Sequence, residues 1–292
     1  MRKLALVAVL AVACGGIAAH AQTLALAYKG GDTYKYAFHS IANESVETGA
    51  TSIPIKLDLS AVETVRVKSV DSSGTADLSL DLSNVVLKSS YSTATSTTTG
   101  TPMATISMKV AVDGRILSVN GNSFGGDPFT SFGGGGGAFI SAVLPEKKVS
   151  PKDTWSKDFD QANPMGTGTI HVTTSSTYLR DESLKGINAA VVETKTNGTI
   201  DITIDMSKAL AGAPTSTPTI PPGMFQSLSM KGTVTSTVTS WIDPSGHRVI
   251  KSHKIGRIIA TMTYVGGTAT ALPGLSGPTT IKGDETTDLN PA

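Results

Sequence analysis

Apolar and polar residues alternate along most of the chain with the period of two expected of β-strands that bury one face. Between residues 33 and 39, for example, Tyr34, Tyr36 and Phe38 share one face. The same alternation recurs in four further stretches: 53–59, 76–82, 106–112 and 200–204. Threonine and serine fill many of the other positions, and both suit a solvated pleated surface. The pattern predicts an all-β chain with antiparallel strands.

Turn sequences separate these predicted strands. Asp113-Gly114 lies between two apolar runs, and this pair favours a type I′ hairpin turn because both central residues need positive φ. Asn197-Gly198 has the same chemistry, and we expect a second tight turn there. Residues 71–74 (DSSG) and 243–246 (DPSG) read as longer turns.

Two parts of the chain resemble each other. The strand pair around Gly74 is similar to the pair around Gly186, and the hairpin at Gly114 is similar to the one at Gly246. We therefore expect a strongly curved antiparallel sheet or open β-barrel made of two similar halves. These halves would be residues 24–120 and 150–266, joined by a connector over 121–149. Each half would cover the apolar face of the other, giving a single β domain over 22–267.

Two segments depart from the strand pattern. The apolar stretch 138–144 (AFISAVL) precedes Pro145, which disfavours helix at the residue before it. We predict one short central helix there. Residues 268–292 are rich in Gly, Thr and Pro and lack an apolar period. They predict a disordered tail.

The N-terminus predicts export. A cationic start (Met1-Arg2-Lys3) and an apolar run precede Ala19-His20-Ala21, so residues 1–21 resemble a signal peptide cleaved between Ala21 and Gln22. The apolar run is shorter than the roughly 20 residues of a membrane span, and no later stretch is long and apolar enough. A periplasmic or extracellular location follows. Cys14 sits in a loose lipobox, so a lipid-anchored form with Cys14 lipidated is the alternative.

Charge excludes one class of function. The chain has 24 basic and 23 acidic residues, and only 16% of its residues are charged. A nearly neutral chain lacks the positive patch that nucleic-acid binding requires. No nucleic-acid partner is therefore expected.

The glycine-rich connector contains one candidate catalytic motif. Residues 121–125 (GNSFG) fit the nucleophile elbow around Ser123, but that motif needs a helix directly after the serine, and the next residues are GDP. Five glycines at 133–137 lack the residues of a phosphate-binding loop. We predict no catalytic residue, no cofactor and no enzymatic activity. The glycines form either a plain connector or a hinge for an apolar flap containing Phe129, Phe132, Phe139 and Ile140.

A metal site is not expected either. His247 and His253 are six residues apart, which on one strand would place them on the same face and supply half a site. Metal sites need further convergent ligands, and two solvent-facing histidines are the simpler reading.

Residues 144–159 (LPEKKVSPKDTWSKDF) form the most specific segment. Trp155 either closes one end of the core or contacts a ligand. A Tyr-x-Tyr strand (34–36), this LP-x-K-x-V-x-x-x-DTW segment and VVET at 191–194 resemble an uncharacterised family of exported bacterial β-rich proteins. The resemblance spans most of 24–265 and implies no activity. Lys152 stands where that family usually has glycine, which predicts a different turn. More remotely, the predicted sheet is similar to the half-barrels of periplasmic lipoprotein carriers.

Our leading hypothesis is non-enzymatic binding of an apolar or lipid-like ligand in a β-lined cavity. The contacts would be the flap residues, Trp155, Met224 and Phe225, and methionines would make the walls adaptable: Met103, Met108, Met224 and Met230. The alternative is a structural or protein-interaction module with a packed core. A hydrolase would instead require Ser123 next to a histidine.

Overall fold

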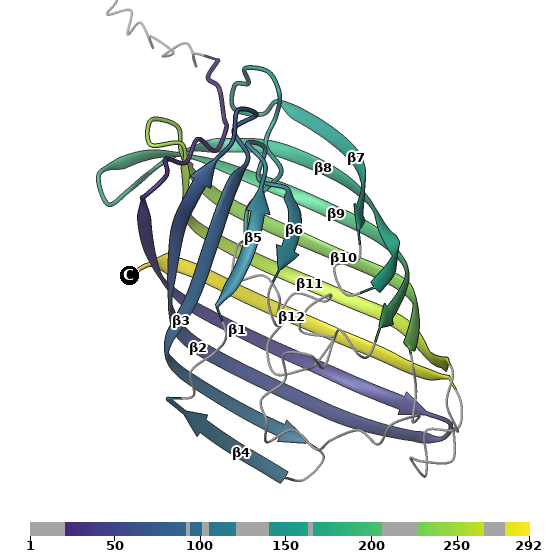
Figure 1. The fold of residues 1–292 in the computed structure, drawn as a ribbon. Coiled ribbons are helices and arrows are strands. Elements are labelled where there is room, and N and C mark those ends of the chain that lie inside the picture. The colour runs from purple at the N-terminus through teal and green to yellow at the C-terminus, as the bar shows by residue number, and fades with distance from the viewer. Residues whose placement is uncertain are drawn as a thin grey trace, which may run out of the picture.

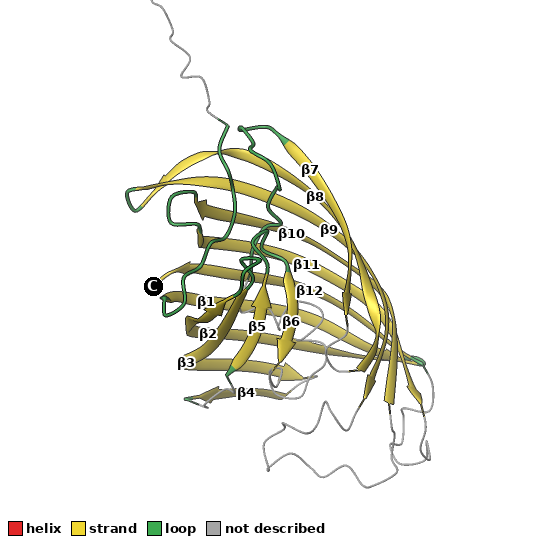
Figure 2. Cartoon of the chain, turned by 45° about the horizontal axis from the view of Figure 1, so that its top comes forward, coloured by secondary structure: helices red, strands yellow, loops and turns green. Residues whose placement is uncertain are grey.

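The fold is a single curved antiparallel sheet (Figures 1 and 2). The computed structural model describes residues 21–91, 94–100, 105–120, 140–162, 166–205, 227–265 and 278–292. Every regular element in these ranges is a strand: β1 (Thr33–Thr48), β2 (Thr51–Val70), β3 (Ala76–Tyr91), β4 (Ala94–Thr99), β5 (Ile106–Val110), β6 (Ile116–Asn120), β7 (Thr154–Ala162), β8 (Gly166–Leu184), β9 (Ile187–Asp205), β10 (Ser227–Asp243), β11 (Arg248–Val265) and β12 (Thr279–Pro291). The predicted all-β class is confirmed. The part of the chain described here has no helix of the length and apolarity that a membrane span requires.

Strand order shows how the sheet is assembled. Along the sheet it runs β6-β5-β3-β2-β1-β12-β11-β10-β9-β8-β7, with β4 paired to β3. Two antiparallel meanders thus meet where β1 pairs with β12, over Tyr36 to Thr48 of β1. The outer strands β6 and β7 curve toward each other without forming a ladder. The result is a barrel-like sheet that stays open along one seam.

Side chains rather than backbone bonds bridge the seam. Lys157 of β7 donates to Asp113, beside the start of β6, at 2.6 Å. The Arg115 guanidinium lies 5.1 Å from the centre of the Phe159 ring, a favourable cation–π distance. Burial raises the pKa of Asp113, but hydrogen bonds and charge from Lys157 and Arg115 outweigh it and leave that pKa lowered.

Close packing of glycine helps the sheet to curve. Gly232 of β10 approaches β11 so tightly that a Cβ atom would overlap the carbonyl oxygen of Ile259 and the Cα of Ala260. A glycine inside a strand commonly marks such a bend or close backbone approach. Gly198 of β9 likewise leaves room for Val234, whose Cγ1 would lie 2.6 Å from an added Cβ.

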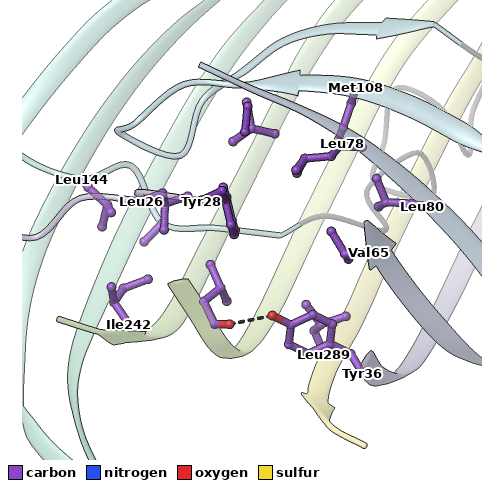
Figure 3. Close-up of a cluster of buried hydrophobic side chains, with 14 of the residues drawn as sticks. Leu26, Tyr28, Tyr36, Val65, Leu78, Leu80, Met108, Leu144, Ile242 and Leu289 are labelled. Carbon is purple, nitrogen blue, oxygen red and sulfur yellow. Dashed lines mark hydrogen bonds between the residues drawn. The ribbon is translucent and has the colours of Figure 1, made fainter. Parts of the chain in front are cut away.

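The main core fills one end of the concave face. Residues from distant strands meet in it, among them Val65 of β2 and Tyr178 of β8. Figure 3 shows strand residues such as Tyr36 and Leu78 together with Leu26 and Tyr28 from the segment before β1. The Tyr36 hydroxyl donates to the carbonyl of Val249 at 2.7 Å. Inward residues of strands far apart in the order can meet only on the concave side, so this cluster identifies that face.

Two extended segments close this end, and we call them the plug: residues 22–28 and 140–149. The first pairs with the second through a bridge between Gln22 and Val149. It also donates from the amide of Leu26 to Val112 and from that of Ala27 to His247. Leu24 and Leu144 are both fully buried. The plug therefore forms part of the core.

The predicted central helix is wrong for the residues that can be described. Residues 140–144 have no regular secondary structure, and 138–139 lie outside the described ranges. Side-chain hydroxyls of the sheet bind this backbone: Ser240 accepts from the amide of Ala142 at 2.8 Å, Thr194 accepts from that of Val143 at 2.9 Å, and Ser252 donates to the carbonyl of Ile140 at 2.8 Å. These strand hydroxyls replace the hydrogen bonds of a helix, so the apolar segment can lie across the sheet.

The predicted tail over 268–292 is also wrong from residue 278 onward. β12 lies at the middle of the sheet between β1 and β11. Its inward residues include Gly283, Glu285 and Thr287, which are buried although they are not apolar. Because these inward positions are small or polar, only Ile281 and Leu289 gave a hydrophobic signal, which was too sparse to predict a strand. Residues 268–277 lie outside the described ranges.

One predicted turn is wrong as well. Asn197 and Gly198 lie inside β9, where they pair with β8 and β10. Asp113 and Gly114, in contrast, do lie in the turn that connects β5 to β6, but it is not the expected type I′ turn, because Gly114 has φ +84° and Asp113 does not have positive φ. The Asn-Gly pair is accommodated in a strand because its glycine faces Val234 on the crowded concave side.

Lys152 adopts the backbone conformation of a glycine. It follows Pro151 in a turn in which the amide of Asp153 donates to Ser150 at 3.0 Å, and its φ is +81°. Proline at the second position and positive φ at the third are typical of a type II turn, which favours glycine there.

Replacing Lys152 with glycine should stabilise the fold. The left-handed conformation costs a non-glycine residue roughly 1–2 kcal/mol. The Lys152 side chain is exposed and has no described hydrogen bond or ion pair, and glycine would keep the backbone hydrogen bond to Tyr178. We expect Lys152→Gly to raise the free energy of unfolding by about 1 kcal/mol, measured by urea denaturation. Lys147→Gly, a nearby exposed position without positive φ, should not stabilise. A Lys152→Gly protein less stable than the parent would contradict this account of the turn.

Candidate functional site

Apolar side chains continue along the concave face beyond the core. On β2, Ile53, Ile55, Leu57 and Leu59 alternate in step with the core residue Val65. The pairing of β2 with β1 is unbroken over this length, so these four side chains point to the same concave side. Leu59 and Ile55 stand opposite Leu87 and Tyr91 of β3. We call these six residues the concave stripe.

The concave stripe is only partly covered. Its β2 residues and Leu87 are all partly exposed, and Tyr91 exposes 55% of its surface. The next inward positions on the same strand, from Ala61 to Val67, are buried. Burying apolar surface is worth about 25 cal/mol per Å², so a contiguous, partly exposed apolar strip on a curved face is a candidate binding surface.

A second apolar cluster lies on the same concave face, on β8 to β12. Its members include Ile202, Met230, Met262 and Ile281, all at most 4% exposed. Unlike the concave stripe, this cluster is already covered. Of the methionines expected to line a cavity, Met230 lies here and Met108 lies in the main core; Met103 and Met224 lie outside the described ranges.

Four polar residues meet on the concave face beside the concave stripe: Ser40 of β1, Lys254 of β11, and Glu285 and Thr287 of β12. We call them the polar cluster. Glu285 accepts from Lys254 at 3.2 Å, from Thr287 at 2.7 Å and from Ser40 at 3.3 Å. The Lys254 and Glu285 side chains are 16% and 8% exposed. This ion pair lies in the interior, where charges are costly unless paired and hydrogen-bonded.

The other predicted contact residues have mixed outcomes. Phe129, Phe132, Phe139, Met224 and Phe225 lie outside the described ranges, as do Cys14 and the motif around Ser123. Ile140 is buried in the plug. Trp155 packs against the main core, and its indole nitrogen donates to the Val143 carbonyl at 2.9 Å. In this structure, Trp155 therefore anchors the plug.

Histidines pair with aspartates on several strands. His39 contacts Asp58 at 3.0 Å, and His253 contacts Asp288 at 2.8 Å. Within the described ranges, no serine hydroxyl is hydrogen-bonded to a histidine, and no group of three or more residues has the arrangement of a metal site. His247 lies in the turn between β10 and β11 with φ +50°, so His247 and His253 do not share one strand.

A polar cleft of about 320 Å³ lies at the plugged end, lined by residues from 32–34 and 243–248. Its groups already have partners. Tyr34 donates to Asp32 at 2.8 Å and lies under the Arg248 guanidinium at 5.3 Å. Asp243 accepts from the amides of Ser245 and Gly246 in the turn. This arrangement fits the structural stabilisation of a turn.

Glu63 is the most unusual buried group. It is fully buried in β2, and neither carboxyl oxygen has a hydrogen-bond partner. Its cross-strand neighbours are Tyr36 and Leu82, both in the main core. Burial raises the pKa of Glu63 well above its usual range, because desolvation disfavours the charged form. A neutral carboxyl group at this position is the form that the core accommodates.

Sequence reasoning missed Glu63, the polar cluster and the plug-binding hydroxyls. Lys254 could not be assigned to the concave face because its strand also carries the outward apolar residues Ile255 and Ile259, which are 55% and 39% exposed. Glu63 did give a signal. It occupies an inward position between Ala61 and Val65 in the alternation of β2.

The raised pKa of Glu63 predicts a specific dependence of stability on pH. The unfolded state loses this proton near pH 4.3, whereas the folded state keeps it, so the free energy of unfolding falls by up to about 1.4 kcal/mol per pH unit above that point. The fall ends at the folded-state pKa. Glu63→Gln should abolish this contribution and be more stable than the parent at pH 7, measured by urea unfolding from pH 4 to 8. Glu47→Gln, at a partly exposed ion pair with Lys282, is the control. If the free energies of unfolding of the parent and of Glu63→Gln changed in parallel between pH 4 and 8, the prediction would be contradicted.

Comparisons with known proteins assign no family to this chain. No family model and no curated protein matches the chain. Among solved structures, the chain is similar to lipovitellin, from work on lipid–protein interactions in that protein, at a TM-score of 0.42 and 13% sequence identity. The match covers 90% of this chain and 25% of lipovitellin, so the chain spans about a quarter of its length.

Proposed function

We propose that this protein binds an apolar or lipid-like ligand on the concave face of its sheet and does not convert it chemically. The observation that carries the proposal is the concave stripe, an apolar strip that remains partly exposed inside a sheet whose other end is closed by the plug. Ligand sites are typically concave and mostly apolar, with a few polar groups that orient the ligand. The polar cluster supplies such groups beside the stripe.

A structural or interaction module with a packed interior is the alternative. The burial of the second apolar cluster and of the plug favours it, because those parts of the concave face are already filled. The two functions make opposite predictions for the concave stripe. A packed module would not take up an apolar ligand there.

We also propose that the chain is exported, which is supported by the signal-like residues 1–21. The plug begins directly after them, at Gln22. The mass of the protein purified from its own cells should match a chain beginning at Gln22. A mass corresponding to a diacylglycerol on Cys14 would contradict this and indicate the lipid-anchored form.

Substitution of Ile55 tests the binding proposal. Ile55→Asn should weaken the binding of an apolar fluorescent probe about tenfold or more, because burying one isoleucine side chain is worth roughly 1.5–3 kcal/mol. The matched control is Ile259→Asn, which makes the same change at a partly exposed isoleucine on the convex face of β11. It should leave the affinity unchanged. Fluorescence titration measures both, with thermal unfolding to show that each variant is folded.

Two results would reject the proposal. Failure of the parent protein to bind the probe would favour the packed module. Equal losses of affinity in Ile55→Asn and Ile259→Asn would place the probe away from the concave stripe.

A further inference from the structure

The polar cluster and the concave stripe meet in one row of the sheet. Lys254 pairs across strands with Thr287, Thr287 with Ser40, and Ser40 with Leu59. All of these side chains belong to the concave face, because the ladders joining the four strands are regular here. A ligand lying on the stripe therefore has this polar group beside one of its ends.

The unused hydrogen-bonding capacity of the cluster lies on Lys254. Glu285 uses both oxygens, since Oε1 accepts from Ser40 and Thr287 and Oε2 accepts from Lys254. An ammonium group has three N–H donors, and within the described ranges Glu285 is the one side chain that accepts from Lys254. The cluster can therefore offer donors to an oxygen acceptor on a ligand.

The charges of the polar cluster limit which kind of acceptor group the ligand can carry. Lys254 and Glu285 balance each other, so the pair has no net positive charge to offset an anion. A fully anionic head group bound to Lys254 would lie beside the Glu285 carboxylate, and like charges repel strongly where water is scarce. A neutral carbonyl oxygen accepts from Lys254 without that penalty.

The stripe has the length of a long hydrocarbon chain. Leu59 and Ile53 are six residues apart on β2, which corresponds to about 20 Å at the rise of a strand. The strip is apolar at each inward position over this length, from Leu59 through Leu57 and Ile55 to Ile53.

We propose that Lys254 binds the ester carbonyl of a neutral acyl lipid whose hydrocarbon chain lies along Ile53 to Leu59. This inference rests on the proposed function and adds the class of ligand and the residue that orients it.

Competition binding tests the inference. A hydrocarbon fluorophore bound to the parent protein is displaced by three ligands of equal chain length: a monoacylglycerol, the corresponding fatty acid and the corresponding alkane. The monoacylglycerol should bind about tenfold more tightly than the alkane, because its carbonyl gains one hydrogen bond to a charged group and such a bond contributes about that factor to affinity. It should also bind more tightly than the fatty acid at pH 8.

Two pairs of substitutions isolate the polar cluster. The double variant Lys254→Met/Glu285→Met removes the donor together with its carboxylate partner, so no buried charge is left unpaired and no new N–H donor is added. It should lose the preference for the monoacylglycerol and keep the affinity for the alkane. Lys282→Met/Glu47→Met makes the same changes in an ion pair 2.8 Å long on the convex face, and it should retain the preference. Lys254→Arg should retain it as well, because arginine still donates.

Each further outcome is decisive. A preference that survives in Lys254→Met/Glu285→Met would overturn the assignment of Lys254, and tighter binding of the fatty acid in the parent would overturn the choice of a neutral head group. In both cases the fluorophore still binds, so the proposed function stands. Failure of the parent to bind the fluorophore would reject the proposed function and this inference together.

Discussion

The pairing of β1 with β12 is the contact on which the rest of the structure depends. It joins two meanders that otherwise have no shared ladder within the described residues. It also brings residues 247 positions apart into one polar cluster, since Ser40 and Thr287 are cross-strand partners. Long-range strand pairing of this kind is entropically costly to form. The single twelve-stranded sheet and its shared concave face exist because this pairing joins the two meanders.

The plug imposes a second constraint. An extended segment that crosses a sheet cannot use the backbone groups of that sheet, because the ladders already engage them. Hydroxyls of Ser176, Thr194, Ser240 and Ser252 supply the missing partners. These small polar side chains explain how an apolar segment closes one end of the concave face. The concave stripe lies beyond the plug, on a part of the concave face that stays partly exposed.

Much of the sheet could be predicted from local patterns. Residues such as Tyr36, Leu78 and Ile202 alternate with polar neighbours, and each lies on the concave face of a strand. The pattern failed where inward residues are small or polar. β12 has Gly283, Glu285 and Thr287 at inward positions, so it resembled a disordered tail although it lies in the middle of the sheet.

The candidate site was harder to predict, for a related reason. The polar cluster consists of residues from β1, β11 and β12 that share a row only because β12 pairs with both β1 and β11. No local motif marks such a row. The residues 140–144 failed as a helix prediction because their stabilising partners are hydroxyls on distant strands. Of the strands at the candidate site, β2 alone had a sequence pattern that could predict its role: its apolar alternation continues past the core, from Leu59 to Ile53.

Photolabelling tests the central claim most directly. A long-chain acyl lipid with a photoreactive group in its hydrocarbon chain is bound to the folded protein and irradiated, and the labelled residues are mapped by peptide mass spectrometry. The account predicts label on the concave stripe, concentrated between Ile53 and Leu59 and opposite them on β3. Label confined to outward residues such as Ile255 and Ile259, or none above that of the unfolded control, would contradict it.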